Sequence, residues 1–212
     1  MRDATKRKAF LRSLHLPLNL ILPEQVHGTE IAVVNSKDIE KKIPNVDGLV
    51  SKATPDQNFI LGVLVADCVP LLLVDPKTRI LGAVHAGWKG TIGGIARKVV
   101  EVMKTLGAQP KDILVSIGPH IGMCCYDVPA ERAQRFLDIF HNDPKVASLI
   151  EGEWHIDVGY ANFLTLVDQG ILSKNIQASI GCTSCQIDTY FSYRKDTKET
   201  FGEMIGIVTW KT

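Results

Sequence analysis

The chain has 212 residues, 45% of them hydrophobic, which is enough for one sizeable core. Its formal net charge is +1, so we expect no bulk attraction to nucleic acid or to an anionic membrane surface. The polar, basic N-terminus MRDATKRKAF resembles no secretory signal, and no apolar run approaches the roughly 20 residues that span a bilayer. We therefore expect a single cytoplasmic domain over residues 1–212.

The spacing of apolar residues predicts a domain that mixes helices and strands. Helical patterns cover residues 4–15, about 91–106, 129–141 and about 157–170. Strand-length apolar runs occur at 29–34, 60–65, 71–74, 80–84, 113–117, 176–180 and 204–210. The hairpin-length loop between Val74 and Ile80 requires some antiparallel pairing. These patterns predict one α/β domain with a mixed sheet.

The stretch VADCVPLLLVDPKTRILGAVHAGWKG, residues 65–90, is the strongest candidate for a functional site. Cys68 and His85 each follow a strand-length apolar run, and His27 lies at another junction between a loop and a strand. Two imidazoles and a thiolate suit zinc, with a fourth position open for water. Their spacing matches no compact metal motif. The alternatives are a nucleophilic Cys68 with His85 or His27 as base, or a buried thiol beside two hydrogen-bonded imidazoles.

The other cysteines have weaker signals. Five cysteines are an odd number, which argues against a disulfide framework. The adjacent Cys124 and Cys125 are expected to be packed in the interior, because adjacent cysteines rarely share one metal ion without strain. Cys182 and Cys185 have the CxxC spacing of a zinc or redox half-site. No second CxxC accompanies them, so we expect a structural or incidental role.

Residues 188–194, DTYFSYR, combine aromatic side chains with Arg194. Such a segment could stack on a flat base and hold an anion. The alternative is an ordinary half-buried strand with a solvated arginine.

Five ordered motifs recur together in one known family: QVHG at 25–28, ADC at 66–68, VHAGW at 84–88, GP at 118–119 with CCY at 124–126, and FSYR at 191–194. On these motifs the chain resembles the YfiH/DUF152 family, and the resemblance extends from about residue 5 to 210. That family has been catalogued as multicopper polyphenol oxidoreductase or laccase-domain proteins. The resemblance implies that His27, Cys68 and His85 together bind one metal ion, usually zinc.

The resemblance also implies a fold and an activity. The fold is a single three-layer α/β/α-type domain, like that of a toxin group of cysteine-type deamidases. The activity is phosphorolysis of adenosine, inosine and methylthioadenosine, with adenosine deamination. Some bacterial members are linked to hydrolytic editing of peptidoglycan precursors. Family members usually carry an extra N-terminal segment with a Thr-Arg and a Gly-Gly motif, which we expect to be absent here.

The copper-oxidase name can be tested on composition. Blue multicopper oxidases hold several copper ions with many histidines, often in His-x-His pairs. This chain has six histidines and no such pair, so one chain cannot supply that cluster. A single Cu²⁺ could still occupy a His-Cys-His site, because copper binds most sites more tightly than zinc.

Together these observations predict a metal-dependent enzyme acting on a purine nucleoside and phosphate. A zinc-activated water would serve deamination. Arg194 is the candidate for anion binding, and Asp67 and Gln25, which lie in two of the motifs, are candidates for further substrate contacts. The competing hypotheses are a copper-dependent oxidase of phenolic compounds, a cysteine hydrolase using Cys68 and His85, and a binding role without catalysis.

Overall fold

A six-stranded mixed sheet forms the centre of the fold. The computed structural model describes residues 4–54, 59–197, 199 and 202–210. The strands of this large sheet follow the order β13 (Ile176–Ala178), β9 (Leu114–Ile117), β7 (Val69–Asp75), β8 (Ile80–Ala86), β5 (Gly48–Lys52) and β3 (Ile31–Val33). Pairing is antiparallel in the middle and parallel at both ends. The predicted mixed sheet is confirmed, and the short loop after Val74 joins the antiparallel pair β7–β8.

A second sheet packs against one face of the large sheet. Its strands are β1 (Leu20–Ile21), β6 (Ile60–Val65) and β14 (Met204–Val208). Leu61 and Val63 of this sheet pack with Leu49 and Leu81 of the large one, and all four side chains are fully buried. Two further short strands, β2 (Pro23–Glu24) and β4 (Ile43–Pro44), pair in parallel beside it. Sequence patterns did not indicate that the strands divide into separate sheets.

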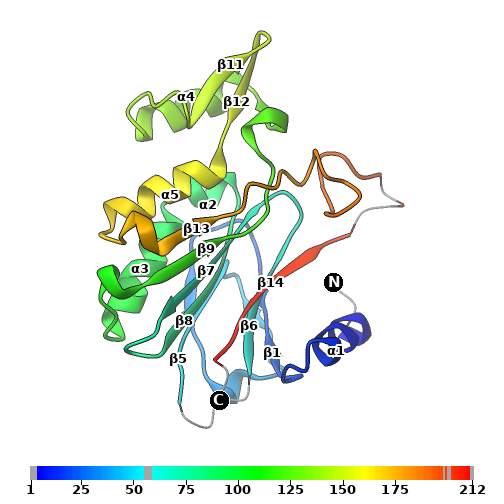
Figure 1. Cartoon of the computed structure of the whole chain (residues 1–212), viewed down its shortest axis with the longest axis vertical. Coiled ribbons are helices and arrows are strands. Elements are labelled where there is room, and N and C mark those ends of the chain that lie inside the picture. Colours follow the sequence, from blue (N-terminus) through cyan, green and yellow to red (C-terminus); the bar gives the residue numbers. More distant parts are fainter. Residues whose placement is uncertain (1–3, 55–58, 198, 200–201, 211–212) are drawn as a thin grey trace.

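Helices cover the opposite face of the large sheet. They are α2 (Trp88–Ile92), α3 (Ile95–Thr105) and α5 (Val158–Asp168), and α1 (Ala4–Ser13) lies beside the second sheet on the other side of the molecule (Figure 1). Val99 and Met103 of α3 bury their side chains in the same hydrophobic core as Leu71 and Leu73 of β7. The arrangement confirms the α/β class, with the second sheet added to the expected layers. No helix in the described residues is long and apolar enough to cross a membrane.

The helix predicted over 91–106 is two helices. It begins earlier, at Trp88, and is interrupted at Gly93 and Gly94, where Gly94 has φ +81°. A left-handed residue cannot continue a right-handed helix, and only glycine adopts that backbone without a steric penalty. At Gly93 a Cβ atom would lie 2.5 Å from Thr29 Cγ2, so the break also lets the chain pass close to the loop after His27.

A smaller lobe carries the remaining elements. Helix α4 (Ala130–Ile139) packs on a three-stranded sheet of β10 (Asp127–Val128), β12 (Glu153–Ile156) and β11 (Ala147–Ile150), at the top of Figure 1. Short 3-10 helices occupy Ser36–Asp38, Pro110–Asp112, Met123–Cys125 and Ser173–Asn175. Asp157 caps α5, the helix predicted over about 157–170, by accepting a hydrogen bond from Tyr160 N.

Candidate metal centre

Three side chains from separate segments meet at one edge of the two sheets. Cys68 lies in the turn between β6 and β7, His85 lies near the end of β8, and His27 lies in the loop after β2. Their ligand atoms all lie within 4.8 Å of one another, and the two imidazole rings meet edge to face with centroids 4.7 Å apart. The structure therefore brings together the three residues that the sequence selected.

Asp47, just before β5, holds the loop that carries His27. The carboxylate of Asp47 accepts hydrogen bonds from the backbone N–H groups of Val26 (3.1 Å), His27 (2.8 Å) and Gly28 (2.7 Å). These bonds fix His27 in a left-handed conformation with φ +59°, which directs its side chain toward Cys68 and His85. Asp47 is itself fully buried, so its charge depends on these donors.

The same carboxylate fixes the ring of His85. Asp47 Oδ1 lies 2.8 Å from His85 Nδ1, which leaves Nε2 on the side of Cys68. Burial opposes the charge on His85, but the hydrogen bonds to Asp47 and Cys68 outweigh it and raise the pKa of His85 to about 9. Burial likewise opposes ionisation of Asp47, and the hydrogen bond with His85 and those from Gly28 and Val26 lower its pKa. A carboxylate behind a ligand histidine is a common outer partner in metal sites.

Cys68 is activated by its two histidine neighbours. Burial raises the pKa of its thiol, but hydrogen bonds from His27 and His85 outweigh that effect and lower the pKa to about 7. A large fraction of Cys68 is therefore thiolate at neutral pH, the form that binds metals or attacks as a nucleophile.

Gly87 leaves open the space in front of the three side chains. A Cβ atom at this position would lie 3.1 Å from His27 Cδ2, 3.2 Å from Cys68 Sγ and 3.7 Å from His85 Cε1. Two nitrogen donors and a sulfur donor around such a space fit a tetrahedral ion with one open position. The donor set suits zinc and also suits copper.

The three side chains line a pocket of about 920 Å³, a size typical of small-molecule sites. Trp88, Tyr126 and Tyr193 supply aromatic surface, and Arg132 and Arg194 supply positive charge. Arg132 lies on α4, with its guanidinium carbon 4.2 Å from the centroid of the Trp88 ring. Its buried Nε atom has no hydrogen-bond partner among the described residues.

The other predicted site residues also line this pocket, but their polar groups have protein partners. The Gln25 amide forms two 2.8 Å hydrogen bonds with the backbone of Leu64. Asp67 accepts hydrogen bonds from Thr183 Oγ1 (2.6 Å) and Arg194 N (2.7 Å). The geometry thus gives Gln25 and Asp67 a positioning role, and direct substrate contact by either residue stays a prediction.

Arg194 lies in a loop, so the alternative of a strand over 188–194 is wrong. Its guanidinium forms an ion pair with Asp127 at 2.6 Å and lies 5.2 Å from the ring of Tyr126.

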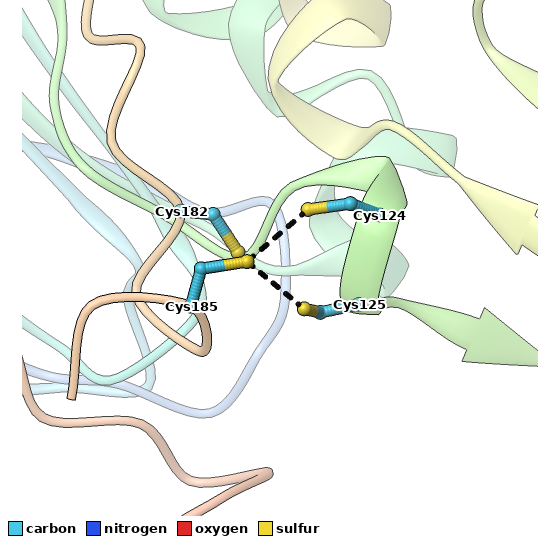
Figure 2. Close-up of side chains that lie close together, drawn as sticks. All are labelled: Cys124, Cys125, Cys182 and Cys185. Carbon is cyan, nitrogen blue, oxygen red and sulfur yellow. Dashed lines mark hydrogen bonds between the residues drawn. The ribbon is translucent and has the colours of Figure 1, made fainter.

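The expectation of interior packing for Cys124 and Cys125 is wrong. Cys124 is exposed and Cys125 is half-buried, on the 3-10 turn Met123–Cys125. Their sulfur atoms lie 3.5 and 3.3 Å from Cys185 Sγ (Figure 2). The CxxC segment and the adjacent pair therefore form one group of four thiols, which their separation in the sequence concealed.

Sequence reasoning also missed Asp47 and Arg132. Asp47 lies outside the motifs and apolar runs described above, and a buried acid has no pattern of its own in a single sequence. Arg132 lies on an amphipathic helix, where a charged residue is ordinarily solvent-facing.

An α/β fold with a His-Cys-His group in a pocket is typical of metal-dependent enzymes of small substrates. Residues 3–211 match the model of the family described as multi-copper polyphenol oxidoreductase laccase, and the chain belongs to that family, the YfiH/DUF152 proteins.

Several relatives carry names from nucleoside chemistry. The chain is 36% identical over 183 residues to adenosine deaminase RL5 of an unknown prokaryotic organism, covering 84% of this chain and 70% of the relative. It is 36% identical over 199 residues to purine nucleoside phosphorylase YlmD of Geobacillus stearothermophilus, covering 87% and 70%. The crystal structure of that YlmD superposes with a TM-score of 0.88 at 33% identity over 97% of this chain and 80% of YlmD. The hypothetical protein YfiH of Bacillus licheniformis superposes with a TM-score of 0.87 at 31% identity, covering 96% and 79%.

Asp47→Asn should weaken zinc binding by about 10- to 100-fold, because an amide cannot accept all four N–H groups or fix the ring of His85 as a carboxylate does. Competition with a chromophoric chelator measures the affinity. Asp138→Asn, on the exposed surface of α4, is the matched control and should leave the affinity unchanged. Unchanged zinc affinity in folded Asp47→Asn would show that Asp47 does not organise the site.

In the zinc-free protein, alkylation of Cys68 should reach half its maximal rate near pH 7, because the folded-state pKa is lowered and the thiolate persists above that pH. The rate should fall as pH decreases through 7. Peptide mass spectrometry after iodoacetamide treatment separates Cys68 from the other cysteines. His27→Ala removes one of the stabilising hydrogen bonds and should move the midpoint to higher pH.

Proposed function

We propose that the protein is a metal-dependent purine nucleoside enzyme, which cleaves adenosine, inosine and methylthioadenosine with phosphate and also deaminates adenosine. The main support for this proposal is that His27, Cys68 and His85 converge in one pocket. The same pocket also holds Arg132. The names of the relatives support this reaction class.

In the proposal, His27, Cys68 and His85 hold one zinc ion, and Asp47 keeps His85 in the tautomer that presents Nε2. When bound, the zinc ion supplies a Lewis acid facing the pocket. The thiolate of Cys68 offsets part of the ion's charge, and Gly87 keeps the open position free of side-chain atoms.

The pocket wall provides the two surfaces that a nucleoside and phosphate require. The rings of Trp88, Tyr126 and Tyr193 offer faces on which a flat purine can stack. Arg132 and Arg194 carry positive charge for the phosphate. Arg132 is the stronger candidate, because its guanidinium forms no ion pair with any described residue, whereas that of Arg194 already pairs with Asp127.

Phosphorolysis needs few groups beyond these. A phosphate oxygen bonds to C1′ of the ribose as the bond from C1′ to the purine nitrogen breaks. The electron pair of that bond leaves with the base, which takes up a proton, and ribose 1-phosphate remains. Arginine side chains beside the sugar orient the phosphate and exclude alternative poses.

A cysteine hydrolase is the second candidate, and one observation favours it. Cys68, His85 and Asp47 form a hydrogen-bonded chain in the order nucleophile, base and orienting carboxylate. Copper-dependent phenol oxidation on the same three ligands is a third candidate, supported by the family description. It requires an external oxidant, because Zn²⁺ has no redox chemistry.

The zinc-loaded protein should release hypoxanthine from inosine only with phosphate present, and equally well without oxygen. His85→Ala should abolish the activity by removing a metal donor. His141→Asn, at an exposed left-handed position that asparagine tolerates, is the control and should remain active. Liquid chromatography of the products measures both.

The other outcomes separate the candidates. Turnover that survives chelation but fails on thiol alkylation would favour the cysteine hydrolase. Oxygen uptake on phenols that depends on added copper, with no turnover of any nucleoside, would make the oxidase assignment correct.

Arg132→Gln should raise the KM for phosphate by roughly tenfold or more, since hydrogen bonds to a charged group contribute about 1.5–3 kcal/mol. Arg194→Gln should have a smaller effect because Asp127 already engages that guanidinium. Arg97→Gln is the control, on the exposed surface of α3 and outside the pocket lining. An equal KM in the Arg132→Gln and Arg97→Gln variants would exclude Arg132 from the phosphate site.

A further inference from the structure

A second group of possible metal ligands lies outside the His-Cys-His centre. Cys124 and Cys125 follow β9, and Cys182 and Cys185 follow β13, the parallel neighbour of β9 in the sheet. The carboxyl ends of parallel neighbours lie at the same edge of a sheet, so both segments reach one place. An isolated bridge between His120 and Cys182 and a hydrogen bond from Thr183 N to His120 O (3.0 Å) join them.

The four thiols are close enough together to bind one tetrahedral ion. Their sulfur atoms all lie within 4.8 Å of one another, and all four cysteines are free. With zinc–sulfur bonds of about 2.3 Å, the sulfurs of a regular tetrahedron are roughly 3.8 Å apart. The observed contacts of Cys185 with Cys125 (3.3 Å) and Cys124 (3.5 Å) are close to that edge length. All four side chains point toward a common centre in Figure 2.

The backbone around the group also suits thiolates. Cys182 Sγ accepts a hydrogen bond from Gly122 N at 3.2 Å and another from the backbone of Cys185. Backbone N–H donors stabilise sulfur ligands that carry charge. The 3-10 turn Met123–Cys125 lets adjacent cysteines face the CxxC segment, which resolves the geometric objection to neighbouring ligands.

We propose that Cys124, Cys125, Cys182 and Cys185 form a second, structural zinc site. Each ligand loses its thiol proton to solvent when the ion binds. The close spacing fits one ion, because an iron–sulfur cluster would place further iron and sulfide between the cysteines. A closed tetrathiolate set has no open position for substrate, so the role is structural.

The zinc ion would stabilise an otherwise irregular segment that lines the pocket. Between β13 and β14, the described residues of 179–203 form turns and no strand or helix, and segments of this length need fixed points. Thr183, between the two cysteines, donates to Asp67 beside Cys68, and Arg194 N donates to the same carboxylate. Tyr126, next to Cys125, lines the pocket. The second ion would thus hold Arg194 and Tyr126 in place from outside the catalytic centre.

Zinc content tests the proposal without an activity assay. Protein produced with added zinc and purified under reducing, anaerobic conditions should hold about two ions per chain by elemental mass spectrometry. His85→Ala should keep about one, and X-ray absorption of that variant should show four sulfur neighbours at about 2.3 Å. Adding Cys124→Ser and Cys185→Ser to His85→Ala should remove the remaining ion. Cys68→Ser, which leaves the four thiols intact, should match His85→Ala.

Wild-type protein provides a second measurement in case a variant fails to fold. Two zinc sites average five sulfurs over two ions, about 2.5 per zinc, whereas the His-Cys-His site alone gives one. An average near one would overturn the proposal. A disulfide between the 124–125 and 182–185 segments in reduced preparations, or iron in place of zinc, would also overturn it.

Discussion

The candidate metal centre depends on the hydrogen bonds that the buried carboxylate of Asp47 accepts. One side chain accepts three backbone N–H groups from the His27 loop and the Nδ1 of His85. A fully buried charge is tolerable only when its hydrogen-bond sites are occupied, so the loop and the histidine stabilise the carboxylate as much as it positions them. One carboxylate therefore fixes two possible metal ligands, His27 and His85, from distant segments. Moving either residue would leave a buried charge without a hydrogen-bond partner, which costs free energy.

Asp67 has a similar role on the other side of Cys68. Its carboxylate joins Thr183 and Arg194, and its backbone oxygen accepts a hydrogen bond from Ile121 N. The irregular segment after β13 is thereby attached to the turn that presents the Cys68 thiol. Much of the pocket is consequently built from loops at the ends of strands, where substitutions alter the site while the sheet behind it stays unchanged.

The arrangement of side chains around Gly87 limits the kind of ion that the site can bind. The space kept open by Gly87 and the sulfur and nitrogen donors around it favour a soft or borderline cation. The carboxylate behind His85 serves a metal ligand and a catalytic base equally well, so the protein scaffold alone is compatible with either use. The reaction class depends on which metal binds and on what the arginine side chains of the pocket hold. Dependence of the activity on phosphate therefore distinguishes the nucleoside enzyme from the other candidates.

Residue patterns in the sequence determined the α/β class, most element positions and the three central residues. His27, Cys68 and His85 were identifiable because rare, chemically reactive residues at strand ends and in ordered motifs carry information locally. Asp47 and the four-cysteine group depended on tertiary structure. A buried acid acquires its role only from the donors that folding brings to it, and cysteines some 60 residues apart become neighbours only because β9 and β13 pair in parallel. Periodicity reports which face of a strand is buried, but it does not report which strands are adjacent.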